Sequence, residues 1–69
     1  MTQADIIHIS NQAAMKAGFR LADFEPPSVT APMNGKWTVF YEGKTPVLGN
    51  HFLVWVDDRT GKTKVMLGE

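Results

Sequence analysis

Apolar residues occupy nearly every position of the stretch His51–Asp57, whereas a strand with one wet face normally alternates apolar and polar residues. A polar turn follows over residues 57–62, with Asp57 to cap it and Gly61 at a position that accepts positive φ. Apolar residues return after the turn as far as Leu67. The pattern predicts two antiparallel strands joined by a short turn, the first of them apolar on both faces.

A helical period replaces this pattern near the N-terminus. Thr2 and Asp5 have the spacing of a capping box, and Gly18 suits a left-handed residue just past a helix end. Between them, apolar residues recur at helical spacing at Ile6, Ile9, Ala13 and Ala17, with Ile7 and Ala14 widening the stripe. The segment predicts an amphipathic helix of about four turns, whose alanines allow close packing on a sheet.

Prolines and glycines punctuate the middle of the chain. The segment Phe19–Phe24 fits either an extension of the helix end or a short extended piece, and Pro26 and Pro27 then stop regular structure. Residues 28–33 contain Pro32, so a strand there must be an edge strand.

Two further features complete the predicted sheet. Asn34-Gly35 is a strong hairpin signal, and Lys36–Tyr41 after it is rich in aromatic and β-branched residues, which favour a strand. Residues 42–50, with Pro46 and Gly49, predict a loop. The expected fold is therefore α+β over a single domain, residues 1–69: one N-terminal helix packed on a three- to four-stranded antiparallel meander.

Alternation along the predicted strands sorts their side chains onto two faces. The aliphatic set matches the helix and consists of Val54, Val56, Val65 and Leu67, with Phe52 and Val39. The other face collects Trp55, Leu53, Met66 and Phe40, with His51 at its rim. Strand register cannot be read from sequence, so the faces that Phe40 and Trp37 join stay open.

An apolar second face has two interpretations. A patch with Trp and Met residues is typical of a protein interface. Alternatively Phe19, Leu21 or Phe24 folds over it and makes it ordinary core. We favour the interface interpretation on residue type.

Composition narrows the function. The chain of 69 residues has seven basic and seven acidic residues, which gives a net charge of zero and no basic stripe for a phosphate backbone. We therefore expect no nucleic-acid or membrane partner. Cysteine is absent, which removes disulfides and thiolate metal sites and fits the cytoplasm; a removed signal peptide would instead indicate the periplasm or secretion.

Candidate catalytic groups do not form a recognised motif. Gly61-Lys62-Thr63 lacks the glycine that a phosphate-binding loop needs five positions earlier, where Val56 stands. His8 and Ser10 lie two positions apart on the predicted helix, where they do not share a face, so solvated side chains are expected. We predict no catalytic residues, no metal site, no cofactor, and a protein that is not an enzyme.

Trp37-Thr-Val-Phe-Tyr41, followed by Phe52-Leu-Val-Trp-Val-Asp57 and Thr60-Gly61, resembles PepSY-type domains. The arrangement is also similar to small immunity proteins with an NTF2-like or cystatin-like fold. The resemblance implies a helix laid over an antiparallel sheet and a role in binding or inhibiting another protein, such as a toxin or a peptidase, and it carries over no catalytic residues.

The sequence thus predicts a non-catalytic protein-binding module of the immunity or inhibitor kind. Its expected partner-binding residues are Trp55, Leu53, Met66, Phe40 and His51. Two alternatives remain: a structural homodimer built through the same face, and a small-ligand-binding domain. The second alternative needs a pocket between helix and sheet, which Ala13, Ala14 and Ala17 disfavour because small residues invite close packing.

Overall fold

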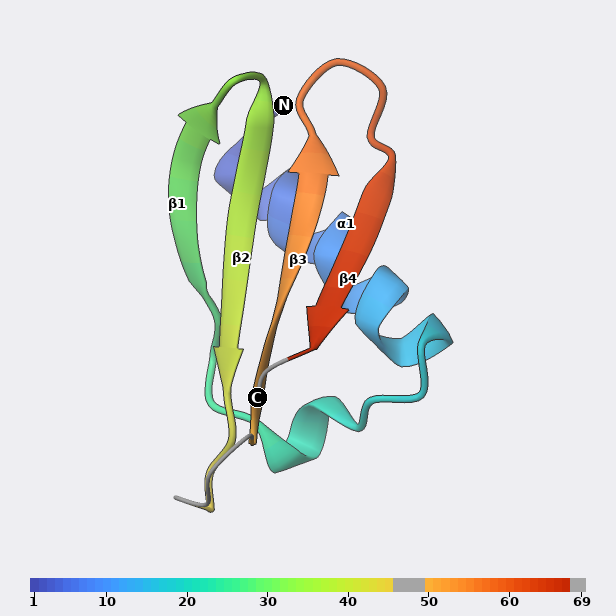
Figure 1. The fold of residues 1–69 in the computed structure, drawn as a ribbon, viewed down its shortest axis with the longest axis vertical. Helices are drawn as coiled ribbons and strands as arrows, with labels where there is room; N and C mark the ends of the chain where they lie inside the picture. Colours follow the sequence, from blue (N-terminus) through green and yellow to red (C-terminus); the bar gives the residue numbers. More distant parts are fainter. Residues whose placement is uncertain (46–49, 68–69) are drawn as a thin grey trace.

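The structure, a computed structural model, describes residues 1–45 and 50–67 and has two layers, with one helix lying diagonally across the back of an antiparallel sheet (Figure 1). In chain order the elements are α1 (Gln3–Lys16), the 3-10 helix η1 (Leu21–Asp23), β1 (Ser28–Met33), β2 (Lys36–Glu42), β3 (His51–Asp57) and β4 (Thr63–Leu67). The sheet has four strands in the order β1-β2-β3-β4. The predicted α+β meander is confirmed.

Helix α1 begins and ends where its capping residues predict. The Thr2 hydroxyl accepts from the backbone N–H of Asp5, and the Asp5 carboxylate accepts from the backbone N–H of Thr2, which completes the capping box. At the other end Gly18 has a φ of +100°, the left-handed conformation that terminates many helices. No helix in residues 1–45 or 50–67 is long and apolar enough to cross a membrane.

Turn chemistry sets the register of the two hairpins. Asn34 and Gly35 both have positive φ, as the tight turn between β1 and β2 requires. In the β3–β4 turn, Asp57 Oδ1 accepts from the backbone N–H groups of Arg59 and Thr60, and Gly61 has a φ of +76°. These turns leave Val29, Val39, Val54 and Val65 side by side in one row across the sheet.

The core lies between this face of the sheet and α1. Its fully buried members are Ile6, Ala14, Val39, Tyr41, Phe52, Val54 and Val56. Trp37 lies opposite Val56 and packs against the same core, which answers the open question of its face. Its indole N–H donates to Asp58 Oδ1 at 2.7 Å.

Two expectations about single residues were wrong. Ser10, expected in solvent, is fully buried, because the helix presents the line Ile6, Ser10 and Ala14 to the sheet. Leu67, expected on the face that packs on the helix, lies opposite Phe52 but is 73% exposed, since it falls at the end of the edge strand β4.

The segment after α1 adds aromatic residues to the core. Phe19 stacks on Phe52 with ring centroids 3.9 Å apart, and Phe24 meets Phe52 edge to face at 5.0 Å. Leu21, in η1, also packs against the core. The ambiguous segment is thus a short 3-10 turn that closes one end of the helix-side core. Pro46 and Gly49 of the predicted loop lie outside the described residues.

Candidate functional site

The face of the sheet turned away from α1 carries a continuous row of apolar side chains. Phe40 lies opposite Leu53, and Leu53 lies opposite Met66, so that the row crosses β2, β3 and β4. Phe40 is 37% exposed, and Leu53 and Met66 are half-buried. Register therefore places Phe40 with the candidate binding residues. We call this surface, with its neighbours Trp55 and His51, the open face.

Trp55 occupies the next row of the open face. Thr38 lies opposite it on β2, and Lys64 lies opposite it on β4. The Lys36 ammonium stands 5.4 Å from the centroid of the Trp55 ring, within cation–π range. Trp55 is thus half-buried by its neighbours in the sheet while its outer surface stays accessible.

Charged and polar residues bound the open face at both ends of the central strands. Lys36 lies opposite Asp57 at one end, and Glu42 lies opposite His51 at the other. The His51 and Phe40 rings are 5.6 Å apart, so His51 continues the aromatic surface. Sequence reasoning missed Lys36 and Glu42 here, although the alternation Lys36, Thr38, Phe40, Glu42 would have found both once Phe40 was placed.

No part of the chain that the structure describes crosses the open face, which looks toward the viewer in Figure 1. The aromatic residues that were alternative covers, Phe19 and Phe24, stack on Phe52, whose side chain belongs to the helix side of the sheet. The interpretation in which they bury Trp55 is therefore wrong. The five predicted binding residues share one surface of the described chain.

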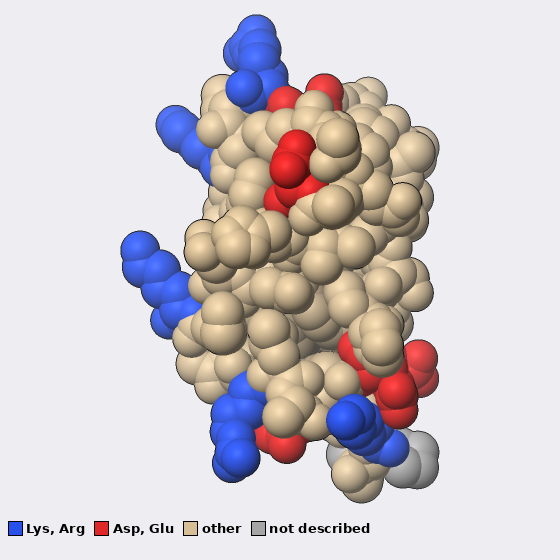
Figure 2. Space-filling view, turned by 180° about the vertical axis from the view of Figure 1, so that it is seen from behind, with Lys and Arg blue, Asp and Glu red and all other residues tan. Residues whose placement is uncertain are grey.

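The opposite side of the molecule has a different character. Figure 2 shows that charged side chains gather near the two ends and along one edge, while the middle carries none. Helix α1 contributes one acidic and one basic residue, Asp5 and Lys16, at its first and last turns. Among the described residues, the middle of the helix side therefore shows no charged side chain in this view.

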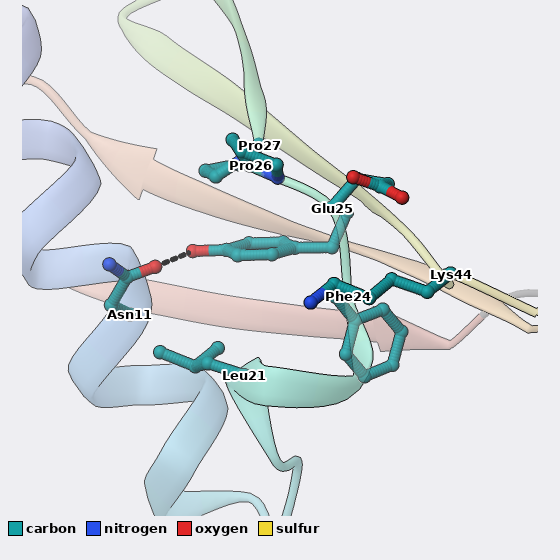
Figure 3. Close-up of a pocket in the computed structure, with 8 residues that line it drawn as sticks. Asn11, Leu21, Phe24, Glu25, Pro26, Pro27 and Lys44 are labelled. Carbon is teal, nitrogen blue, oxygen red and sulfur yellow. Dashed lines mark hydrogen bonds between the residues drawn. The ribbon is translucent and has the colours of Figure 1, made fainter.

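A buried hydrogen-bond relay links α1 to β2. The hydroxyl oxygens of Ser10 and Tyr41 lie 2.8 Å apart, and the Tyr41 hydroxyl donates to Asn11 Oδ1 (Figure 3). Ser10 then donates to Tyr41, because the single phenolic proton is already engaged. Burial raises the pKa of Tyr41 above its usual 10.0, so the phenol stays neutral and acts as a structural connector.

Beside this relay lies a hollow of about 350 Å³, open to solvent, between α1 and the segment after η1. Leu21 and the Pro26–Pro27 pair lie on opposite sides of it in Figure 3. Asn11, Phe24, Glu25, Tyr41 and Lys44 complete its lining. Ala14 is fully buried, as close packing of the alanines predicts, but Ala17 is exposed and the hollow at the flank of the helix was not expected.

Metal-ligating side chains do not cluster within residues 1–45 and 50–67: no group of three or more His, Asp or Glu residues could hold an ion there. His8 is exposed on α1 while Ser10 is buried, so the structure does not bring the two together. The backbone N–H groups of Thr60 and Arg59 hold the pKa of Asp57 below its usual value, as in a capping carboxylate.

Comparison with protein-family models, with curated proteins and with solved structures gave no significant match. The resemblance to PepSY-type and cystatin-like domains therefore stays a prediction.

Proposed function

We propose that this protein is a non-catalytic module that binds another polypeptide through the open face. The observation that carries the proposal is the uncovered apolar row of Phe40, Leu53 and Met66, with Trp55 beside it. An antiparallel sheet with one wet face would place polar residues there. Large exposed apolar patches of this kind mark interaction surfaces.

The residue types of the open face suit binding energetically. Trp, Phe and Met are enriched at protein interfaces, and Trp is among the residues that contribute most to affinity. Trp55 sits centrally on β3, between Thr38 and Lys64, where a partner would remove its outer surface from water. Each 100 Å² of apolar surface covered would contribute about 2.5 kcal/mol before the costs of association.

The polar ends of the open face supply orientation. One end of the open face carries Lys36 beside Asp57, and the other carries Glu42 beside His51. The two ends lie about 20 Å apart along the strands. Rim charges of this kind steer association and reject mismatched partners more than they add affinity. The narrower proposal, that the partner is a toxin or a peptidase, rests on the resemblance to immunity and inhibitor domains.

Substitution on the open face tests the proposal. Partners captured from the native lysate are identified by mass spectrometry, and their affinity for the wild type and for Trp55→Ala is measured by calorimetry. We expect Trp55→Ala to weaken binding at least tenfold while lowering unfolding free energy by only about 1 kcal/mol, because Trp55 is outside the core.

The matched control is Met15→Ala, which truncates a 54% exposed apolar residue on α1, away from the open face. It should leave affinity unchanged. A partner that binds Trp55→Ala as tightly as the wild type, or that is lost with Met15→Ala alone, contradicts the proposal.

A second candidate function, small-ligand binding, is favoured by the hollow of about 350 Å³, which reaches the lower end of ligand-pocket volumes. Its test is a fragment screen followed by amide chemical shifts. Binding in the hollow would shift signals of Asn11, Leu21 and Lys44 together and spare Leu53 and Met66. A screen without such shifts removes this candidate.

A further inference from the structure

We propose that the polypeptide covering the open face is a second copy of this chain, packed face to face about a twofold axis. The axis runs parallel to the strands, midway between the two sheets and in line with the boundary between β2 and β3. This inference rests on the proposed function, since it names the partner of the same surface. Two features of the open face carry it: the arrangement of its charges and the position of its apolar row.

The charges at the two ends are self-complementary under this operation. A twofold axis between β2 and β3 exchanges the two strands, so each residue faces the position of its own cross-strand neighbour in the second copy. Lys36 then faces Asp57 of the second copy, and Asp57 faces Lys36 of the second copy. At the other end Glu42 and His51 are exchanged in the same way. The acidic and basic side chains thus meet their opposites at one end, and each Glu42 carboxylate meets an imidazole at the other.

The same operation places the central part of the apolar row, Phe40 and Leu53, on itself. Phe40 faces Leu53 of the second copy, and Leu53 faces Phe40 of the second copy, because the two are cross-strand neighbours. Met66, on edge strand β4, faces Ser28 on edge strand β1, the register neighbour of Phe40. Lys64 faces Thr30 at the periphery, where its ammonium can reach water.

A twofold axis perpendicular to the strands is the competing arrangement. It would also oppose charges, because Lys36 would face Glu42 of the second copy and Asp57 would face His51. However, it would place Phe40 on Thr38 of the second copy and Trp55 on Leu53 of the second copy, so the contact between Phe40 and Leu53 of the two copies would be lost. The parallel axis places Trp55 on Thr38 of the second copy but keeps Phe40 on Leu53 of the second copy. We select it because it stacks these two apolar residues on themselves while opposing the charges at both ends.

The size of the face indicates a weak dimer. Four strands of five to seven residues present a plane of about 400 Å², and sheets that pack face to face lie about 10 Å apart. A dimer would therefore bury on the order of 1,000 Å² in all, at the low end of specific interfaces. Weak or transient specific complexes fall in this size class. Such association would also stabilise a cysteine-free chain of 69 residues, a size at which a single core is marginal.

Sedimentation equilibrium of the purified full chain, from low micromolar to about 1 mM, is the first test. We expect a monomer–dimer equilibrium whose dissociation constant rises at least tenfold in Trp55→Ala and is unchanged in Met15→Ala. A monomer at every concentration overturns the second-copy inference but not the proposed function, which the lysate partner tests. A dimer that ignores Trp55→Ala overturns the inference as well, and indicates edge-strand pairing instead.

A charge-swap pair then tests the axis. In the variant His51→Glu, the new carboxylate faces Glu42 of the second copy. In the variant Glu42→Lys, the new ammonium faces His51 of the second copy. Each variant alone should therefore dimerise about tenfold more weakly than the wild type. Both positions are on the rim, outside the core. In an equimolar mixture the introduced lysine faces the introduced glutamate, and dimerisation should return to wild-type strength or better. Under the perpendicular axis the introduced lysine would face Lys36 of the second copy. A mixture that dimerises as weakly as each variant alone would therefore overturn the parallel axis.

Discussion

Ser10 Oγ and Tyr41 Oη lie 2.8 Å apart with both residues buried, so the helix and the sheet are joined by a hydrogen bond inside an otherwise apolar core. Tyr41 also stacks on Phe52, with ring centroids 4.5 Å apart. The phenol therefore fixes where α1 lies on the sheet. Positioning of the helix on one face leaves the other face free.

Tyr41→Phe is expected to destabilise the fold although it keeps the stacked ring. The substitution removes the partner of the buried Ser10 hydroxyl and of Asn11 Oδ1, and an unsatisfied buried polar group costs about 1–3 kcal/mol. Thermal unfolding measures this destabilisation, because a loss of 1 kcal/mol lowers Tm by about 4–8 °C in a domain of this size.

The double variant Tyr41→Phe with Ser10→Ala is the control, because it removes both ends of one hydrogen bond. It should recover part of the lost stability, since no hydroxyl is left without a partner. An unfolding free energy equal to that of the wild type in Tyr41→Phe alone would show that the relay does not stabilise the fold.

Gly43→Ala should destabilise the end of the β2–β3 hairpin. A Cβ on Gly43 would lie 2.8 Å from the backbone oxygen of Asn50 and would overlap the Asn50 side-chain amide. Relief requires displacement of backbone, so we expect a cost of about 1–3 kcal/mol in denaturant unfolding.

Gly18→Ala is the matched comparison, because a Cβ there meets open space and the cost is limited to the strain of a φ of +100°. Adding Asn50→Ala to Gly43→Ala should recover stability only in part, since the backbone oxygen of Asn50 remains. Full recovery of the unfolding free energy would show that the added Cβ clashes only with the Asn50 side chain.

Acid should destabilise the protein partly through Asp5 and Asp57. Backbone N–H donors hold the pKa of each carboxylate below 3.8, those of Thr2 for Asp5 and of Thr60 and Arg59 for Asp57. A lowered folded-state pKa gives stability that is present above pH 3.8 and lost as pH falls through the lowered pKa. Tm measured against pH should show this loss.

The double variant Asp5→Asn with Asp57→Asn keeps an oxygen acceptor at each cap but removes both titrations. Its Tm should fall less steeply than that of the wild type below pH 3.8, and should lie lower than the wild type at neutral pH. Parallel profiles for the two proteins would rule out a contribution from these carboxylates.

Local chemistry made most of the fold predictable. The Thr2–Asp5 capping box, Gly18 and the Asn34-Gly35 turn each impose a backbone conformation without help from distant residues, and all three are confirmed. Pro32 likewise marks β1 as an edge strand, and its pairing with β2 shifts register between Thr30 and Met33. These features belong to single residues or to residues at most three positions apart.

Features that depend on strand register and tertiary packing were harder to predict from the sequence. Burial of Ser10 requires that Tyr41 arrive opposite it, which the polarity of a lone serine on a helix does not reveal. The face of Phe40 was fixed only by its register with Leu53. The hollow beside Leu21 arises from the path of the segment after η1, for which the sequence offered two conformations.

The two indole N–H signals in a ¹⁵N–¹H spectrum test most directly whether the open face is the binding surface. Trp55 lies on the open face, whereas the Trp37 indole donates to Asp58 and its ring packs on the core. Raising the concentration of the protein, or adding a partner captured by it, should shift or broaden the Trp55 signal and leave that of Trp37 in place. A Trp37 signal that moves while Trp55 stays fixed would contradict the account.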